Sequence, residues 1–135
     1  MAKSVKYKIK ELKIHSEKRG WFGEMIRMNG IKKTIKQVSV ASIEPGHIRG
    51  NHYHLNKIEW FFIINGKAKF CLKNPKTQER ICFRISSKNP RVITVFPKIA
   101  HAIKNIDQKT IYFVEADSSI YNHKKPDSFS CDVLN

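Results

Sequence analysis

The chain has 135 residues and a formal net charge of +15, from 26 lysines and arginines against 11 aspartates and glutamates, and this length fits a single domain over residues 1–135. The positive charge favours an anionic partner, but the lysines are scattered without a nucleic-acid-binding motif, and no apolar run approaches the roughly 20 residues of a membrane span, so we expect a cytoplasmic protein that binds neither nucleic acid nor membrane. The three cysteines (71, 82 and 131) are odd in number, far apart and without a Cys-x-x-Cys pair, so we expect reduced thiols.

Alternation of polar and apolar residues with a period of two predicts short strands along most of the chain. In chain order, the expected strands are 7–15, 20–28, 35–43, 59–64, 67–73, 80–86, 91–96, 101–105 and 110–116. Short strands at this spacing, separated by turns rich in Pro, Asn and Asp, predict an all-β sandwich or barrel. From about residue 118 the tail is expected to be loop-like, with at most one short turn or helix.

The segment around Asn65-Gly66 gives two further expectations. An Asn-Gly pair between two strands is typical of a two-residue hairpin, so we expect 59–64 and 67–73 to be antiparallel neighbours. Residues 60–64 are apolar on both faces, which requires a cover on the outside of the sheet. We expect the N-terminal strands, about 1–30, or a second subunit to provide it, and we predict a homodimer.

A cluster of polar residues follows Gly46. On a strand, residues i and i+2 share a face, so His52 and His54 should both point inward, with Tyr53 outward. Glu59 then opens the next strand, and His101 heads a later one. Three imidazoles and one carboxylate suit Zn²⁺, or else Fe²⁺, Ni²⁺ or Mn²⁺. We therefore predict a divalent metal site without an organic cofactor; a satisfied hydrogen-bond cluster inside a barrel is the alternative.

The spacing of these residues resembles the cupin family. Gly46, His52, His54, Glu59 and Gly66 are spaced as in the first cupin motif. Pro97, His101 and Asn105 resemble the second, with Lys98 where the family usually has glycine. The resemblance implies the cupin double-stranded β-helix, also called a jelly roll.

Within the cupins, the chain resembles enzymes of nucleotide-sugar metabolism. Residues 17–27, 37–54 and 96–103 are similar to stretches of dTDP-4-dehydrorhamnose 3,5-epimerases, although those have glutamine where His54 stands and a lysine near Glu59. The segment "RGNHYH" (49–54) and the tail "KKPDSF" (124–129) are more similar to the cupin domain of bifunctional capsular-polysaccharide enzymes. There a metal-binding cupin epimerises C3 of a UDP-linked 4-keto sugar. The 3,4-ketoisomerases share the Arg-Gly-x-His-x-His pattern and use its histidines without a metal.

This resemblance implies an isomerase that acts on a dTDP- or UDP-linked 4-keto hexose in surface-polysaccharide biosynthesis. A C4 ketone acidifies the neighbouring C–H bonds, and the enzyme needs a base, an electrophile for the enolate oxygen and an acid on the opposite face. Without a metal, His52 is the expected base and a tyrosine the acid; with a metal bound to the histidines, other groups must move the protons. The expected catalytic residues are His52, His54, Arg49, Tyr121 and Tyr112.

The expected substrate-binding residues include two arginines: Arg49 lies just ahead of the histidines, and Arg19 lies on an early predicted strand. Arginine guanidinium groups hold diphosphates through paired hydrogen bonds. The predicted set is Arg19, Arg49, Lys57, Glu24 and Asn51. Two other functions fit the sequence: a non-catalytic cupin that binds metal or sugar as a sensor or complex subunit, and a metal-dependent dioxygenase.

Overall fold

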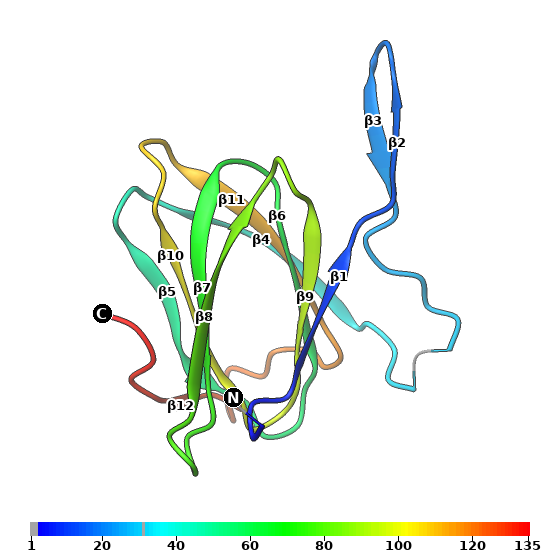
Figure 1. Cartoon of the computed structure of the whole chain (residues 1–135). Coiled ribbons are helices and arrows are strands. Elements are labelled where there is room, and N and C mark those ends of the chain that lie inside the picture. Colours follow the sequence, from blue (N-terminus) through cyan, green and yellow to red (C-terminus); the bar gives the residue numbers. More distant parts are fainter. Residues whose placement is uncertain (1–2, 31) are drawn as a thin grey trace.

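Residues 3–30 and 32–135 are described by a computed structural model, shown in Figure 1. In this part of the chain no helix is long and apolar enough to cross a membrane. The strands are β1 (Tyr7–Glu11), β2 (Ile14–Glu17), β3 (Gly20–Gly23), β4 (Gln37–Ile43), β5 (Ile48–Tyr53), β6 (Glu59–Ile63), β7 (Lys67–Lys73), β8 (Arg80–Ser86), β9 (Arg91–Val95), β10 (Ala100–Asn105), β11 (Ile111–Asp117) and β12 (Phe129–Ser130).

Two five-stranded antiparallel sheets face each other (Figure 1). The first has the order β1-β9-β6-β11-β4 and the second β12-β5-β10-β7-β8, while β2 and β3 form a separate hairpin that projects from the barrel. This architecture confirms the predicted all-β jelly roll. Two predicted strands are too long: 7–15 is interrupted after Glu11, where Leu12 turns into the core, and 20–28 ends at Gly23.

The core lies between the two sheets. Phe61, Ile93 and Ile111 from the first sheet pack with Phe70 and Ile103 from the second, and each is at most 1% exposed. The rings of Phe61 and Phe70 meet edge to face with centroids 5.4 Å apart. Burying each of these side chains contributes about 1.5–3 kcal/mol. The same Phe61 ring packs against His101, so the hydrophobic core directly adjoins the histidine site.

The predicted hairpin at Asn65-Gly66 is wrong, because β6 and β7 belong to different sheets. The pair instead forms a corner at which the chain crosses the sandwich. Asn65 supports the corner: its Nδ2 donates to the Thr110 carbonyl (3.0 Å), and its Oδ1 accepts from the Tyr112 N–H (2.8 Å). Gly66 has φ 74°, and a Cβ there would lie 2.7 Å from Ile111 Cγ2. The Asn-Gly pair therefore marks a sharp turn, but strand partners are set by the closure of the core.

The outer face of β6 is covered by the N-terminal arm of the same chain. Trp60 packs in a cluster with Leu12, Met25, Ile26 and Ile35. The predicted cover from the N-terminal region is therefore confirmed. β1 also pairs with β9, which protects that edge of the first sheet.

The C-terminal tail is loop-like only as far as residue 128. β12 then pairs with β5, and the chain ends with Val133 and Leu134 buried against the second sheet. The expectation of reduced thiols is wrong for two of the cysteines: Cys71 and Cys82 are directly opposite in the β7–β8 register and form a disulfide. Cys131 is a free, half-buried thiol.

Candidate functional site

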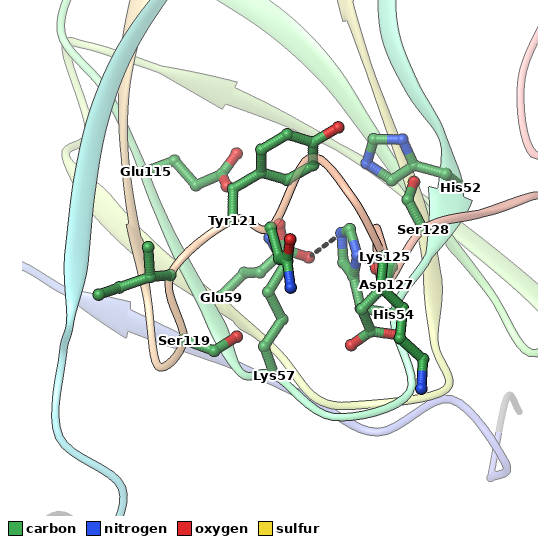
Figure 2. Close-up of a pocket in the computed structure, with 12 residues that line it drawn as sticks. His52, His54, Lys57, Glu59, Glu115, Ser119, Tyr121, Lys125, Asp127 and Ser128 are labelled. Carbon is green, nitrogen blue, oxygen red and sulfur yellow. Dashed lines mark hydrogen bonds and ion pairs between the residues drawn. The ribbon is translucent and has the colours of Figure 1, made fainter.

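A pocket of about 220 Å³ opens at one end of the barrel (Figure 2). It lies beside the C-terminal ends of β5 and β11 and the N-terminal end of β6, and the segment after β11 passes over it. Polar side chains predominate in its lining: His52, His54, Lys57, Glu59, Glu115, Ser119, Tyr121, Asn122, Lys125, Asp127 and Ser128, together with Ile120.

A bulge in β5 sets the direction of His52. His101 pairs with His52, but the next residue of β10 pairs with Gly50, so Asn51 is the extra residue. Asn51 has φ 57° and Gly50 has φ 106°, and a Cβ on Gly50 would lie 2.6 Å from the His101 carbonyl oxygen. His52 and His54 consequently both line the pocket, whereas Tyr53 turns outward and stacks on Phe129, as the period of two predicts for these residues.

Three of the predicted ligands meet at one carboxylate oxygen. His54 Nε2 lies 3.3 Å and His101 Nδ1 lies 3.5 Å from Glu59 Oε1. All three side chains are buried, and neither nitrogen has a hydrogen-bond partner among the described residues. The His52 ring packs against both other imidazoles, with centroids 4.9 Å from His54 and 4.8 Å from His101. The structure therefore brings together all four residues that the sequence places in a metal site.

The charge states of these groups differ because their surroundings differ. Burial, reinforced by the neighbouring His101 and His54, lowers the pKa of His52 to about 4. Burial also lowers the pKa of His101, against the opposing effect of Glu59. For His54 burial is outweighed by Glu59 and by the Asp127 carbonyl, and the pKa is raised. Burial alone would raise the pKa of Glu59, but His101 and His54 lower it to about 2. At neutral pH His52 is therefore a neutral imidazole beside an ionised carboxylate.

Two acidic residues that the sequence reasoning missed lie beside Glu59, and one of them, Glu115, lines the pocket. Glu115 and Asp117 point inward from β11, and oxygens of Glu59, Glu115 and Asp117 all lie within 4.8 Å of one another. Burial and the nearby Glu59 raise the pKa of Glu115 to about 10, and burial raises that of Asp117. Lys57 Nζ lies 3.7 Å from Asp117 Oδ2 and supplies positive charge to this group. Since Ile111 and Phe113 face the core, the period of two in "IYFVEAD" already contained the signal that Glu115 and Asp117 do too.

The other predicted residues are distributed unevenly. Tyr121 and Lys57 line the pocket, and Arg49 lines an adjoining cavity of about 440 Å³ that also contacts His52, His101 and Glu115. The Arg49 Nε donates to the Ser42 carbonyl (2.7 Å).

Four predicted residues lie outside the pocket. Tyr112 is exposed on the outer face of β11, because it alternates with the inward Ile111 and Phe113. Arg19 is exposed on the projecting β2–β3 hairpin, and the exposed Glu24 pairs with Arg27. The side chain of Asn51 binds the backbone of Val133 and Leu134. None of these four side chains lines the pocket of its own chain.

Two imidazole nitrogens and a carboxylate oxygen are donor atoms that suit a divalent cation. The separations of 3.3 and 3.5 Å from Glu59 Oε1 are close to the roughly 3.3 Å between two ligands of a tetrahedral zinc. The three atoms do not all lie within 4.8 Å of one another, so a bound cation would have to draw the two imidazoles together. The unpartnered His54 Nε2 and His101 Nδ1 are each directed at that carboxylate, an arrangement that a cation satisfies. Lys98 also behaves as the cupin motif requires, since it adopts φ 71° at the position usually held by glycine, and its N–H donates to the His54 carbonyl.

The two antiparallel sheets and the inward histidines and glutamate define the chain as a cupin of the RmlC-like type. Residues 15–129 match the family model described as the polysaccharide biosynthesis C-terminal domain, and the chain belongs to this family. This membership confirms the resemblance seen in the sequence and places the chain in polysaccharide biosynthesis.

Two curated proteins are similar to most of the chain. The UDP-2-acetamido-2,6-beta-L-arabino-hexul-4-ose reductase of Pseudomonas aeruginosa is 27% identical over 91% of this chain, which spans only 32% of that protein. The spore coat polysaccharide biosynthesis protein SpsL of Bacillus subtilis is 26% identical over 89% of this chain and 83% of its own length.

Solved structures agree with this assignment. The capsular polysaccharide assembling protein CapF of Staphylococcus aureus superposes with a TM-score of 0.71 at 25% identity, over 90% of this chain and 34% of CapF. The dTDP-4-dehydrorhamnose 3,5-epimerase of Bacillus anthracis gives a TM-score of 0.81 at 18% identity, over 92% of this chain and 77% of the epimerase. The second likeness shows a shared fold.

Proposed function

We propose that this cupin is an epimerase or isomerase that acts on a dTDP- or UDP-linked 4-keto hexose in the assembly of a surface polysaccharide. The observation that carries the proposal is the position of His52, a neutral imidazole facing Tyr121 and Glu115 across the pocket (Figure 2). Family membership and the similarity to a UDP-hexulose reductase and to CapF support the substrate class.

In the proposed reaction His52 removes the proton from the carbon next to the ketone. Its low pKa leaves the ring neutral at pH 7, so a lone pair is available to accept that proton. Tyr121 and Glu115 lie on the other side of the pocket and are positioned to return a proton to the opposite face of the enolate. Deprotonation on one face and reprotonation on the other inverts the carbon.

We assign the metal to His54, Glu59 and His101, which leaves His52 free to act as base. Glu59 makes its ion-pair contacts in the described structure with His54 and His101, not with His52. A bound Zn²⁺, or Fe²⁺, Ni²⁺ or Mn²⁺ in its place, would supply Lewis acidity toward the ketone oxygen. Lys57 and Lys125 line the pocket and Arg49 lines the adjoining cavity, and these three cations are the groups that would hold the diphosphate.

We also propose a homodimer. Val38 and Val40 are 61% and 68% exposed on the edge strand β4, and Phe22 is 64% exposed on the projecting hairpin. Exposed apolar side chains on an edge strand and on a projecting hairpin are typical of a surface that contacts another chain. Arg19 and Glu24 lie in this N-terminal region, so a role for them in substrate binding requires the dimer. Sedimentation of the wild type and of a Val40→Lys variant tests this: the variant should be monomeric, and a monomeric wild type contradicts the proposal.

The decisive test of the reaction is incorporation of deuterium from D₂O into C3 or C5 of a dTDP- or UDP-4-keto hexose, followed by NMR. His52→Asn should slow exchange by about 10²–10⁴-fold, the usual contribution of a general base. His47→Asn is the matched control, because His47 is exposed and outside the pocket. Saturable binding of these sugars without exchange by the wild type would instead identify a non-catalytic binding cupin.

A further inference from the structure

The loop that joins two of the proposed metal ligands is clasped by the chain segment that covers the pocket. Residues 55–58, here called the ligand loop, separate His54 from Glu59. Residues 118–128, here called the strap, connect β11 to β12 and contribute Tyr121 and Lys125 to the pocket wall. The strap touches the ligand loop at both of its ends.

At the start of the strap, Ser118 and Ile58 exchange two hydrogen bonds. The Ser118 N–H donates to the Ile58 carbonyl (3.0 Å), and the Ile58 N–H donates to Ser118 Oγ (2.9 Å). Ile58 directly precedes Glu59. This pair of bonds therefore fixes the backbone that carries the Glu59 carboxylate.

Near the end of the strap, Asp127 accepts three hydrogen bonds from His54 and the ligand loop. Asp127 Oδ1 accepts from the Leu55 N–H and Oδ2 from the Asn56 N–H, both at 2.9 Å. The Asp127 carbonyl accepts a hydrogen bond from His54 Nδ1. Because Nδ1 donates to the Asp127 carbonyl, Nε2 is the ring nitrogen that is left to bind a cation when it loses its proton, and Nε2 is the atom directed at Glu59.

We infer that Asp127 is a positioning residue that couples closure of the strap to binding of the cation. The inference rests on the metal site proposed above. Release of Asp127 frees the ligand loop and the orientation of His54 together, so the cation binds the closed strap more tightly than the open one. By linkage, the cation must hold the strap closed by the same factor. Metal loading thereby also completes the pocket, because the strap carries Tyr121 and Lys125.

The first experiment measures the dissociation constant for Zn²⁺ by competition with a chromophoric chelator. Asp127→Ala should raise it by about 10–100-fold, the usual effect of removing an outer-shell partner. Asp127→Asn should give an intermediate value, because its amide oxygen can still accept one of the two N–H groups. Asp132→Ala is the matched control: it makes the same change five positions away, on an exposed side chain.

The second experiment uses the wild type alone and so does not depend on a variant that folds. Lys124 is an exposed residue of the strap, and trypsin cleavage after it is followed by mass spectrometry with Zn²⁺ or with chelator. Zinc should slow this cleavage, while cleavage after Arg19 on the distant hairpin serves as the internal reference. In Asp127→Asn the cleavage should be faster and the protection by zinc smaller.

Three results would overturn the inference: an unchanged zinc constant in folded Asp127→Ala or Asp127→Asn, cleavage after Lys124 that is indifferent to zinc, or no zinc binding by the wild type. None of these results decides the proposed reaction, which stands or falls separately on deuterium exchange.

Discussion

A variant of Asn51 can distinguish a substrate-binding role for this residue from a structural role. The sequence pattern places it among the substrate-binding residues, but its side chain binds the C-terminal backbone. Oδ1 accepts from the N–H groups of Val133 (3.0 Å) and Leu134 (2.9 Å), and Nδ2 donates to the Leu134 carbonyl (2.9 Å). Asn51→Gly removes these three hydrogen bonds while keeping a backbone that can adopt φ 57°.

The expected loss is about 3 kcal/mol in the free energy of unfolding, at about 1 kcal/mol for each hydrogen bond. In a chain of this size that corresponds to a fall in Tm of about 10 °C. Asn51→Ala should lose roughly a further 1 kcal/mol, because a residue with a Cβ is strained at positive φ. Asn29→Gly, a change at an exposed position, controls for the added freedom of glycine in the unfolded chain.

Thermal and urea unfolding measure the stability of each variant, and binding of dTDP- and UDP-sugars is measured on the same samples below their Tm. The anchoring role predicts lower stability with unchanged sugar affinity. If Asn51→Gly keeps the wild-type Tm but loses sugar affinity, the reasoning is refuted and Asn51 returns to the substrate site.

Three further predictions concern the pocket and the corner that supports it. Glu59→Gln should weaken zinc binding by more than about 100-fold, since outer-shell changes alone cost about 10–100-fold. Metal analysis of this variant beside the exposed control Glu24→Gln measures the effect, and equal zinc contents in the two variants would contradict the prediction. Burial and Glu59 raise the folded-state pKa of Glu115 from 4.5 to about 10, so the unfolded chain binds fewer protons between these values and stability must fall as pH rises. Glu115→Gln should therefore flatten the wild-type decline between about pH 6 and pH 9 in urea unfolding with chelator present, and parallel curves would argue against a protonated Glu115. Gly66→Ala should cost roughly 2–4 kcal/mol through positive-φ strain and a clash with Ile111, and a wild-type Tm would show that the corner relaxes freely.

The spacing of the motif residues predicted which side chains come together in the site, but it did not predict the strand partners and the residues around the site. His52, His54, Glu59 and His101 come together because two of them share a strand face and the barrel brings β6 and β10 to the same end. That information is local or is contained in the cupin spacing. The period of two also places Glu115 on the inward face, since it lies two residues after the inward Phe113, but no motif in the sequence marks it.

The errors arise where global packing decides. Asn65-Gly66 specifies a turn, but only closure of the core determines that β6 and β7 enter different sheets. The sequence offers Arg19 as a guanidinium on an early predicted strand, but its position on a projecting hairpin depends on tertiary structure. The pairing of Cys71 with Cys82 follows from the β7–β8 register, which the intervening residues do not reveal by themselves.

His52 and Glu115 each line both the pocket and the adjoining cavity. The base therefore has access to water from the cavity even when a sugar fills the pocket. A proton captured by His52 can then be exchanged with solvent before the enolate is quenched, so isotope washout should exceed internal return. Substrate labelled with tritium at the reacting carbon should lose its label to the solvent faster than the inverted product accumulates.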